Sequence, residues 1–228
     1  MKIIAFTPVY KRHGILEIWL EGIKRISKIA DIKPVVMVSL REDLDWMLNH
    51  KDKDFDPLIV TCNNNPLSDK QNIGLDTIRD MDWDYICQIS SDLLLTNKGL
   101  LALMDNPADV TGFTKAYFID TIWDRAILFE KRSAHKTIGA CRLISREIIS
   151  GLDYKLWSDG LNRNLDGDSQ QRMEGATFKI INEPLVVGLK SSQQLTPFRK
   201  LLAKSEEIDI REAVEGLSEA EIELMKQL

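Results

Sequence analysis

The chain has 228 residues, of which 44% are hydrophobic and 29% are charged, and its formal net charge is -5. This length and composition suit one globular domain with a substantial core and a small appendage. The negative net charge argues against a general nucleic-acid-binding protein, because phosphate neutralisation requires clustered lysine and arginine. We therefore expect no nucleic-acid partner.

The sequence contains no apolar run long enough to span a membrane, and residues 2–6 resemble a strand rather than a signal peptide. Cys62, Cys87 and Cys141 are widely separated and form no Cys-x-x-Cys pair. Such cysteines are typical of reduced, mostly buried thiols. We therefore expect a cytoplasmic protein.

The first 92 residues alternate between predicted strands and predicted helices. Short apolar runs bounded by polar residues predict buried strands at 2–6, 35–38, 58–60 and 85–89. Apolar residues at helical spacing predict helices at 14–29, 42–48 and 68–81. Ser68 is expected to cap the third helix, with Ile73, Leu75 and Ile78 on its buried face. This alternation implies right-handed crossovers and a mostly parallel sheet.

After Asp92 the pattern changes. Asn97 is expected to cap a short helix that ends at Met104, and strands are predicted at 110–113, 116–119 and 127–129. Two further strands, at 178–181 and 185–187, are expected to pair and close the core. We expect this half of the sheet structure to be mixed or antiparallel.

From Pro197 onward the composition is helical and highly charged. Ser218 and Glu221 form a capping-box pattern ahead of further apolar residues. The apolar stripe of this segment is too large to leave in water. We therefore expect a main domain over 1–192 and a helical extension over 193–228 that packs on the core or on a second subunit, which would make the protein a homodimer.

Four polar clusters fall at the ends of predicted strands or in facing loops. They are residues 7–10 (Thr-Pro-Val-Tyr), 69–74 (Asp-Lys-Gln-Asn-Ile-Gly), 90–92 (Ser-Ser-Asp) and 165–169 (Leu-Asp-Gly-Asp-Ser). Ligands of open α/β sheets bind beyond the carboxyl ends of the strands, so Asp92 would project into the crevice. Its carboxylate could bind a hard divalent cation, or the Ser-Ser-Asp run could be only a turn or a helix cap.

The order of these clusters resembles that of the GT-A glycosyltransferases, and within them the family 2 type. In that family a Thr/Ser-Pro-x-Tyr-like turn cups a nucleotide, an Asn-x-Gly helix start approaches it, and an Asp-x-Asp-like motif ends the fourth strand. Here Asn72-Ile73-Gly74 and the run from Asp84 to Asp92 match this pattern, and residues 139–146 and 166–172 look like the acceptor-side half. The resemblance covers residues 2–191 and implies a GT-A fold: an α/β protein with a mostly parallel central sheet flanked by helices.

The resemblance implies an inverting, non-processive transfer of a sugar from a nucleotide-diphospho-sugar, with uridine as the base, to a hydroxyl of a carbohydrate or another acceptor. Asp92 would hold Mn²⁺ or Mg²⁺ against the donor diphosphate, and Asp166 would act as general base on the acceptor hydroxyl. The other residues expected to bind substrate are Thr7, Pro8, Tyr10, Lys70, Asn72, Ser90, Ser91, Trp157, Asp159 and Asp168.

Several residues depart from the family pattern, and others could have a structural role in place of a functional one. The Ser-Ser-Asp run keeps only the last carboxylate of the metal motif, and Ser39 stands where the family often has an acidic residue for the base. Trp157 could be a core residue, and Asp166 and Asp168 could be charges that favour a helix start. Two alternatives therefore stay open. One is a degenerate GT-A domain that binds sugar or a protein without turnover. The other is a sugar-nucleotide nucleotidylyltransferase, against which the lack of glycines in residues 7–12 counts.

Overall fold

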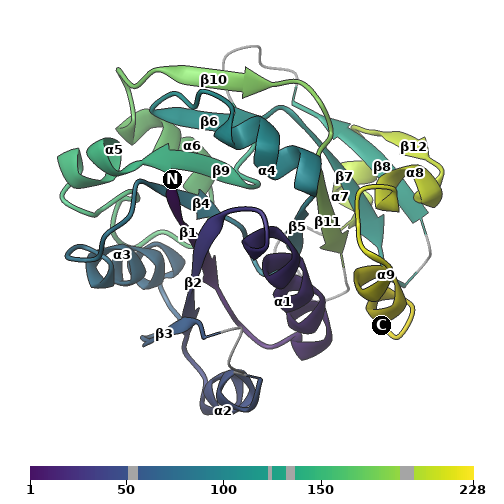
Figure 1. Ribbon diagram of the computed structural model, residues 1–228, viewed down its shortest axis with the longest axis horizontal. Coiled ribbons are helices and arrows are strands. Elements are labelled where there is room, and N and C mark those ends of the chain that lie inside the picture. Colours follow the sequence, from purple (N-terminus) through teal and green to yellow (C-terminus); the bar gives the residue numbers. More distant parts are fainter. Residues whose placement is uncertain (51–55, 123–124, 132–136, 191–197) are drawn as a thin grey trace.

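The first half of the chain alternates strands and helices, as the computed structural model in Figure 1 shows. The structure describes residues 1–50, 56–122, 125–131, 137–190 and 198–228. The elements of this half are β1 (Lys2–Pro8), α1 (His13–Ser27), β2 (Asp31–Val38), α2 (Arg41–Asn49), β3 (Leu58–Thr61), α3 (Leu67–Thr77) and β4 (Tyr85–Gln88). Every element predicted for this half is confirmed, with shifted ends.

The second half has shorter elements. They are β5 (Leu93–Leu95), α4 (Asn97–Met104), β6 (Val110–Phe113), β7 (Lys115–Asp120), β8 (Arg125–Glu130), β9 (Arg142–Ser145), α5 (Arg146–Gly151), α6 (Leu165–Arg172), β10 (Phe178–Ile181) and β11 (Val186–Lys190). The C-terminal segment adds α7 (Phe198–Leu202), β12 (Glu206–Ile208), α8 (Ile210–Val214) and α9 (Glu219–Met225).

A seven-stranded sheet forms the centre of the molecule, in the order β10-β6-β9-β4-β1-β2-β3. The strands from β4 to β3 are parallel, and β10 is parallel to β6, whereas β9 runs antiparallel to both of its neighbours. Along β1, Ile3 and Ala5 pack into one core cluster while Ile4 and Phe6 pack into another. Burial on both faces explains why this strand is continuously apolar.

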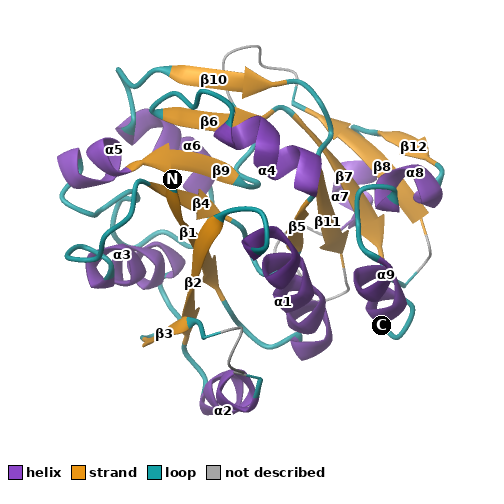
Figure 2. Cartoon of the chain, viewed as in Figure 1, coloured by secondary structure: helices purple, strands orange, loops and turns teal. Residues whose placement is uncertain are grey.

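Helices cover both faces of this sheet (Figure 2). Leu16 and Trp19 of α1 and Leu100 of α4 belong to the cluster on one face. Leu75 of α3 and Ile149 of α5 belong to the cluster on the other. In a three-layer arrangement of this kind, ligands bind beyond the carboxyl ends of the parallel strands.

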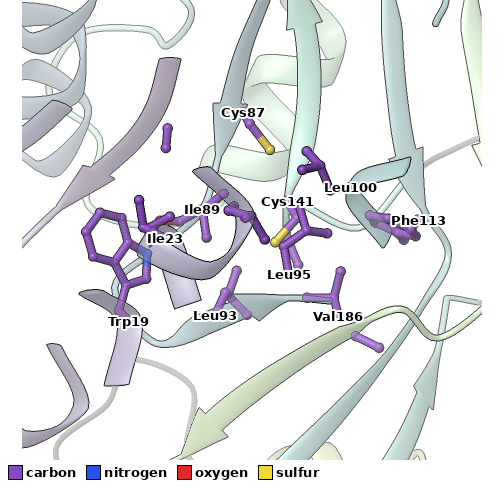
Figure 3. Close-up of a cluster of buried hydrophobic side chains, with 14 of the residues drawn as sticks. Trp19, Ile23, Cys87, Ile89, Leu93, Leu95, Leu100, Phe113, Cys141 and Val186 are labelled. Carbon is purple, nitrogen blue, oxygen red and sulfur yellow. Dashed lines mark hydrogen bonds between the residues drawn. The ribbon is translucent and has the colours of Figure 1, made fainter. Parts of the chain in front are cut away.

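Figure 3 shows part of the first cluster, in which Trp19 and Ile23 of α1 pack with Cys87 of β4 and Leu93 of β5. The buried indole of Trp19 is satisfied, because its Nε1 donates a hydrogen bond of 3.1 Å to the carbonyl of Ile89. Burial of each such side chain stabilises the fold by about 1.5–3 kcal/mol. This packing holds α1 against the junction of β4 and β5.

A second, five-stranded sheet has the order β12-β8-β7-β11-β5. It is mixed, since β11 is parallel to β7 and every other pairing is antiparallel, as predicted for this half. The prediction that residues 178–181 and 185–187 pair with each other is wrong. The link between β10 and β11, which contains Pro184, carries the chain from the first sheet to the second.

Two predicted helix caps are also wrong. Thr96 caps α4 by accepting a hydrogen bond of 3.0 Å from the Gly99 amide, and Asn97 is the first helical residue. Ser68 lies in the first turn of α3, where its hydroxyl accepts from the amide of Leu161. Ile73, expected on the buried face, is 44% exposed, because α3 turns polar residues inward toward a neighbouring loop.

The C-terminal segment lies against both the second sheet and α1. β12 pairs with β8, and α9 contacts α1. The predicted capping box of Ser218 and Glu221 is present, and the buried carboxylate of Glu221 accepts two hydrogen bonds, of 2.8 and 3.0 Å, from Arg25 of α1. The predicted boundary between residues 192 and 193 lies outside the described residues. In the described part of the chain, no helix is long and apolar enough to cross a membrane.

Candidate active site

Two adjoining cavities, of about 610 and 660 Å³, lie beyond the carboxyl ends of β1 and β4. We call them the first and second cavity. The residues that line both are Ser90, Asp92, Asn162, Arg163 and Lys190. The two cavities therefore form one cleft, at the edge where the α/β architecture predicts a ligand site.

Pro8, Tyr10, Lys70, Ser90 and Ser91, all expected to bind substrate, line the first cavity. Four of them lie at or shortly after the ends of β1 and β4, so their positions follow from the sequence, whereas Lys70 reaches the cavity from α3. The other expected residue at the end of β1, Thr7, is fully buried and lies outside both cavities.

Lys70 ties the ends of β1 and β2 together. Its ammonium group donates hydrogen bonds of 2.6 Å to the carbonyl of Val9 and 2.8 Å to the hydroxyl of Ser39. Ser39 in turn donates to the side-chain carbonyl of Asn64, which lines the first cavity. Burial lowers the pKa of Lys70. Lys70 thus shapes the wall of the first cavity.

The loop between β1 and α1 has an unusual backbone. Lys11 and Arg12 both lie in the left-handed region, with φ of 55° and 58°. Such conformations cost about 1–3 kcal/mol each for residues other than glycine and persist only where the surroundings impose them. The buried Asp43 supplies that constraint, since its Oδ1 accepts from the Lys11 amide at 3.0 Å and lies 2.9 Å from Nε2 of His13.

This loop brings Arg12 to the first cavity, where it joins an ionic cluster. Arg12 Nη1 lies 3.8 Å from Asp92 Oδ2, and Lys190 Nζ lies 3.1 Å from the same oxygen. Lys190 ends β11, and its ammonium group lies 4.9 Å from the ring centroid of Phe118. We refer to Arg12, Asp92 and Lys190 as the Asp92 cluster.

The side chains at Asp92 do not fit a divalent cation. Mg²⁺ and Ca²⁺ in proteins are held by several oxygen ligands, usually including carboxylates. Among the described residues that line the first cavity, Asp92 is the single acidic one, and it is already paired with Lys190. Among the residues that the structure describes, no group of three or more His, Cys, Asp or Glu is placed to hold a metal ion.

The structure does not place Asn72 or Trp157 in the cleft. The amide of Asn72 donates a bond of 2.8 Å to the Trp157 carbonyl and accepts one of 3.2 Å from the Trp157 amide. The indole of Trp157 is only 1% exposed and packs in the second core cluster. Both residues hold the loop after Trp157 against α3, and this loop carries Asn162 and Arg163 into the cleft.

Asp159 and Asp168 likewise lie outside both cavities. Asp168 accepts hydrogen bonds from the amide and the hydroxyl of Ser158, at 2.7 and 2.8 Å, so it fixes the start of the same loop. Asp159 is an exposed side chain 3.7 Å from Lys155. Asp168 thus shapes the loop, and neither aspartate is placed to contact a substrate in the cleft.

Asp166 lines the second cavity from the first turn of α6. The carboxylate lies directly against Gly139, where a Cβ would come within 1.9 Å of Asp166 Oδ1. Behind it the fully buried Arg142 donates to the hydroxyls of Thr137 and Ser169, and Ser169 donates to the Asp166 carbonyl. Burial lowers the pKa of Arg142, and the negative charge of Asp166 opposes that shift. This network fixes the first turn of α6.

Sequence reasoning missed several polar residues of the cleft, among them Arg12, Asn162, Arg163 and Lys190. Arg12 stands next to the expected turn, but its approach to Asp92 depends on two left-handed residues. Asn162 and Arg163 follow the loop in which Trp157 was singled out. Lys190 ends an apolar run, and nothing in that run shows that β11 lies beside β5. A third cavity, of about 870 Å³ and lined in part by Thr114, shares Lys131 with the second cavity.

A scan of family models and a search of curated proteins both gave no match. Solved structures do match, and the fold that they share with this chain is that of glycosyltransferases. The predicted α/β fold, with a mostly parallel central sheet flanked by helices, is therefore confirmed. Sequence identities are low, so the likeness concerns the fold alone.

One neighbour is S. aureus TarS 1–349 in complex with UDP-GlcNAc, with a TM-score of 0.64 and 11% identity over 100% of this chain and 71% of that one. Another is the mannosyltransferase PcManGT from Pyrobaculum calidifontis in complex with GDP-Man and Mn²⁺, with a TM-score of 0.55 and 15% identity over 99% and 68%. In two other TarS structures the match spans 60% and 37% of the neighbour's chain.

Proposed function

We propose that this protein is a glycosyltransferase that moves a sugar from a nucleotide-diphospho-sugar to an acceptor hydroxyl. The observation that carries the proposal is the cleft itself, in which Asp166 lines one cavity and the cations of the Asp92 cluster line the adjoining one. Support comes from the shared fold and from the nucleotide sugars bound to the neighbours, UDP-GlcNAc in TarS and GDP-Man in PcManGT.

In this proposal the nucleotide lies in the first cavity, between Tyr10 and Asn64. The diphosphate lies at the Asp92 cluster, and the acceptor enters the second cavity. Asp166 removes the proton of the acceptor hydroxyl while its oxygen attacks the anomeric carbon. The attack comes from the face opposite the phosphate, so the configuration at that carbon is inverted. The bond from that carbon to the phosphate oxygen breaks, and its electron pair stays on the departing nucleoside diphosphate. Cations beside the diphosphate stabilise the charge that grows on the leaving group.

Nucleotide release is the direct test. We expect the purified chain to bind UDP or GDP and to release that nucleotide slowly from UDP-GlcNAc or GDP-Man, with water as the acceptor. Chromatography of the products also separates the alternatives, because a degenerate domain would bind without release and a nucleotidylyltransferase would form pyrophosphate. Absence of binding to either nucleotide would contradict the proposed function.

Gly139→Ala is expected to lower the transfer rate by about 10²-fold and to leave nucleotide affinity unchanged. The new methyl group would overlap the Asp166 carboxylate, and displacement of a catalytic group by about 1 Å costs that much. Steady-state kinetics and calorimetry would measure the two effects. Gly151→Ala is the matched control, because a Cβ there meets no atom within 4 Å. Equal rates for the two variants would contradict the position assigned to Asp166.

A further inference from the structure

The charge lining the first cavity favours an anion over a cation. Of the described residues that line this cavity, Arg12, Lys70, Arg163 and Lys190 are basic and Asp92 alone is acidic. Lys70 directs its ammonium group to Val9 and Ser39 in the wall of the first cavity, so Arg12, Arg163 and Lys190 are the described basic side chains placed there to meet a ligand. A divalent metal entering here would meet an excess of positive charge, whereas a diphosphate would be attracted.

Asp92 is placed as a counter-ion to these cations. Its Oδ2 lies 3.1 Å from Lys190 Nζ and 3.8 Å from Arg12 Nη1, and the Asp92 side chain is only 15% exposed. Its backbone carbonyl also accepts a bond of 2.8 Å from the amide of Leu189. The carboxylate thus aligns a lysine at the end of β11 and an arginine from the loop before α1.

The backbone around Arg12 is held in a strained conformation. Two consecutive left-handed residues lead into α1, and the buried Asp43 holds both Lys11 and His13. An arginine in an ordinary surface turn would need no such anchor. Guanidinium and ammonium groups together bind phosphate oxygens through charge-assisted hydrogen bonds.

We infer that Arg12 and Lys190 neutralise the donor diphosphate in place of a divalent cation, so that nucleotide binding and transfer do not depend on a metal. This inference rests on the proposed function and specifies how its donor site works. Asp92 is then a positioning residue, which holds the two cations, instead of a metal ligand.

Calorimetry with UDP and GDP, each in EDTA and in Mn²⁺, tests the inference. We expect the better-bound nucleotide to have the same affinity in both buffers. Arg12→Met and Lys190→Met are each expected to weaken that affinity about 10- to 100-fold in EDTA, as for loss of a hydrogen bond to a charged group. Lys190→Arg is expected to restore most of the affinity, and Lys226→Met, which removes an exposed lysine just after α9, is the control.

The possible outcomes distinguish failure of the metal-independence inference from failure of the proposed function. Binding that requires Mn²⁺ would overturn the inference and leave the proposed function standing. Metal-independent binding that Arg12→Met and Lys190→Met leave unchanged would overturn the assignment to these two residues. No binding of either nucleotide in any buffer would overturn the proposed function and the inference together.

Discussion

Asp166→Asn is expected to reduce glycosyl transfer by about 10²- to 10⁴-fold, the usual contribution of a general base. Asparagine keeps the shape that fits against Gly139 and removes the basicity. Nucleotide affinity should stay within about twofold of the unchanged protein, because the diphosphate is assigned to the first cavity and Asp166 lines the second. Single-turnover kinetics with saturating donor would measure the chemical step separately from binding.

Asp159→Asn is the matched control for this experiment, since Asp159 is exposed and lies outside both cavities. Asp168→Asn is a second comparison, and we expect it to loosen the loop that Ser158 begins. If Asp166→Asn kept near-normal transfer while either of these variants lost it, the base would be wrongly assigned. The proposed reaction class would survive that result.

Glu221→Ala is expected to lower the free energy of unfolding by about 3–5 kcal/mol, the usual effect of removing one partner of a buried ion pair. Glu221 is fully buried, and it is both the partner of Arg25 and the second half of the capping box with Ser218. The substitution leaves a mostly buried guanidinium group without its carboxylate, although Asn97 and the carbonyl of Leu95 still accept from it. Urea unfolding followed by circular dichroism would measure the change.

Glu223→Ala is the control for that variant. Glu223 lies on the same helix and pairs with Lys226, but its side chain is 64% exposed. Exposed pairs contribute about 0–1 kcal/mol, so its effect should be small. Similar unfolding free energies for the two variants would mean that the docking of α9 on α1 does not depend on the buried pair.

The parallel part of the fold could be predicted because its signals are local. β1 is buried on both faces and reads as a continuous apolar run, and α1 presents Ile15, Trp19, Ile23 and Ile26 at helical spacing. The second sheet could not be predicted in the same way. Whether the strand at Val186 pairs with its sequence neighbour or with a strand from another part of the chain depends on tertiary packing.

The residues of the cleft likewise include some that local sequence signals predict and others that depend on tertiary packing. Tyr10, Ser91 and Asp92 could be placed there because each follows directly after a strand of the parallel sheet. Asn72 was expected there by resemblance and Trp157 because it lies in a polar loop. The side chain of Asn72 instead bonds to the backbone of Trp157, a pairing that no spacing in the sequence indicates. The proposed roles of Asp92 and Asp166 stay predictions, to be decided by the variants above.

The Asp92 cluster also determines when, during synthesis of the chain, a nucleotide-binding site can form. Asp92 and Lys190 are 98 positions apart, and Lys190 arrives only with β11, the strand between β5 and β7. A nascent chain that ends before this strand can form the parallel core but has only one of the two cations. Ribosome-bound intermediates of that length should therefore fold their first half without retaining nucleotide, and capture should begin once β11 has left the exit tunnel.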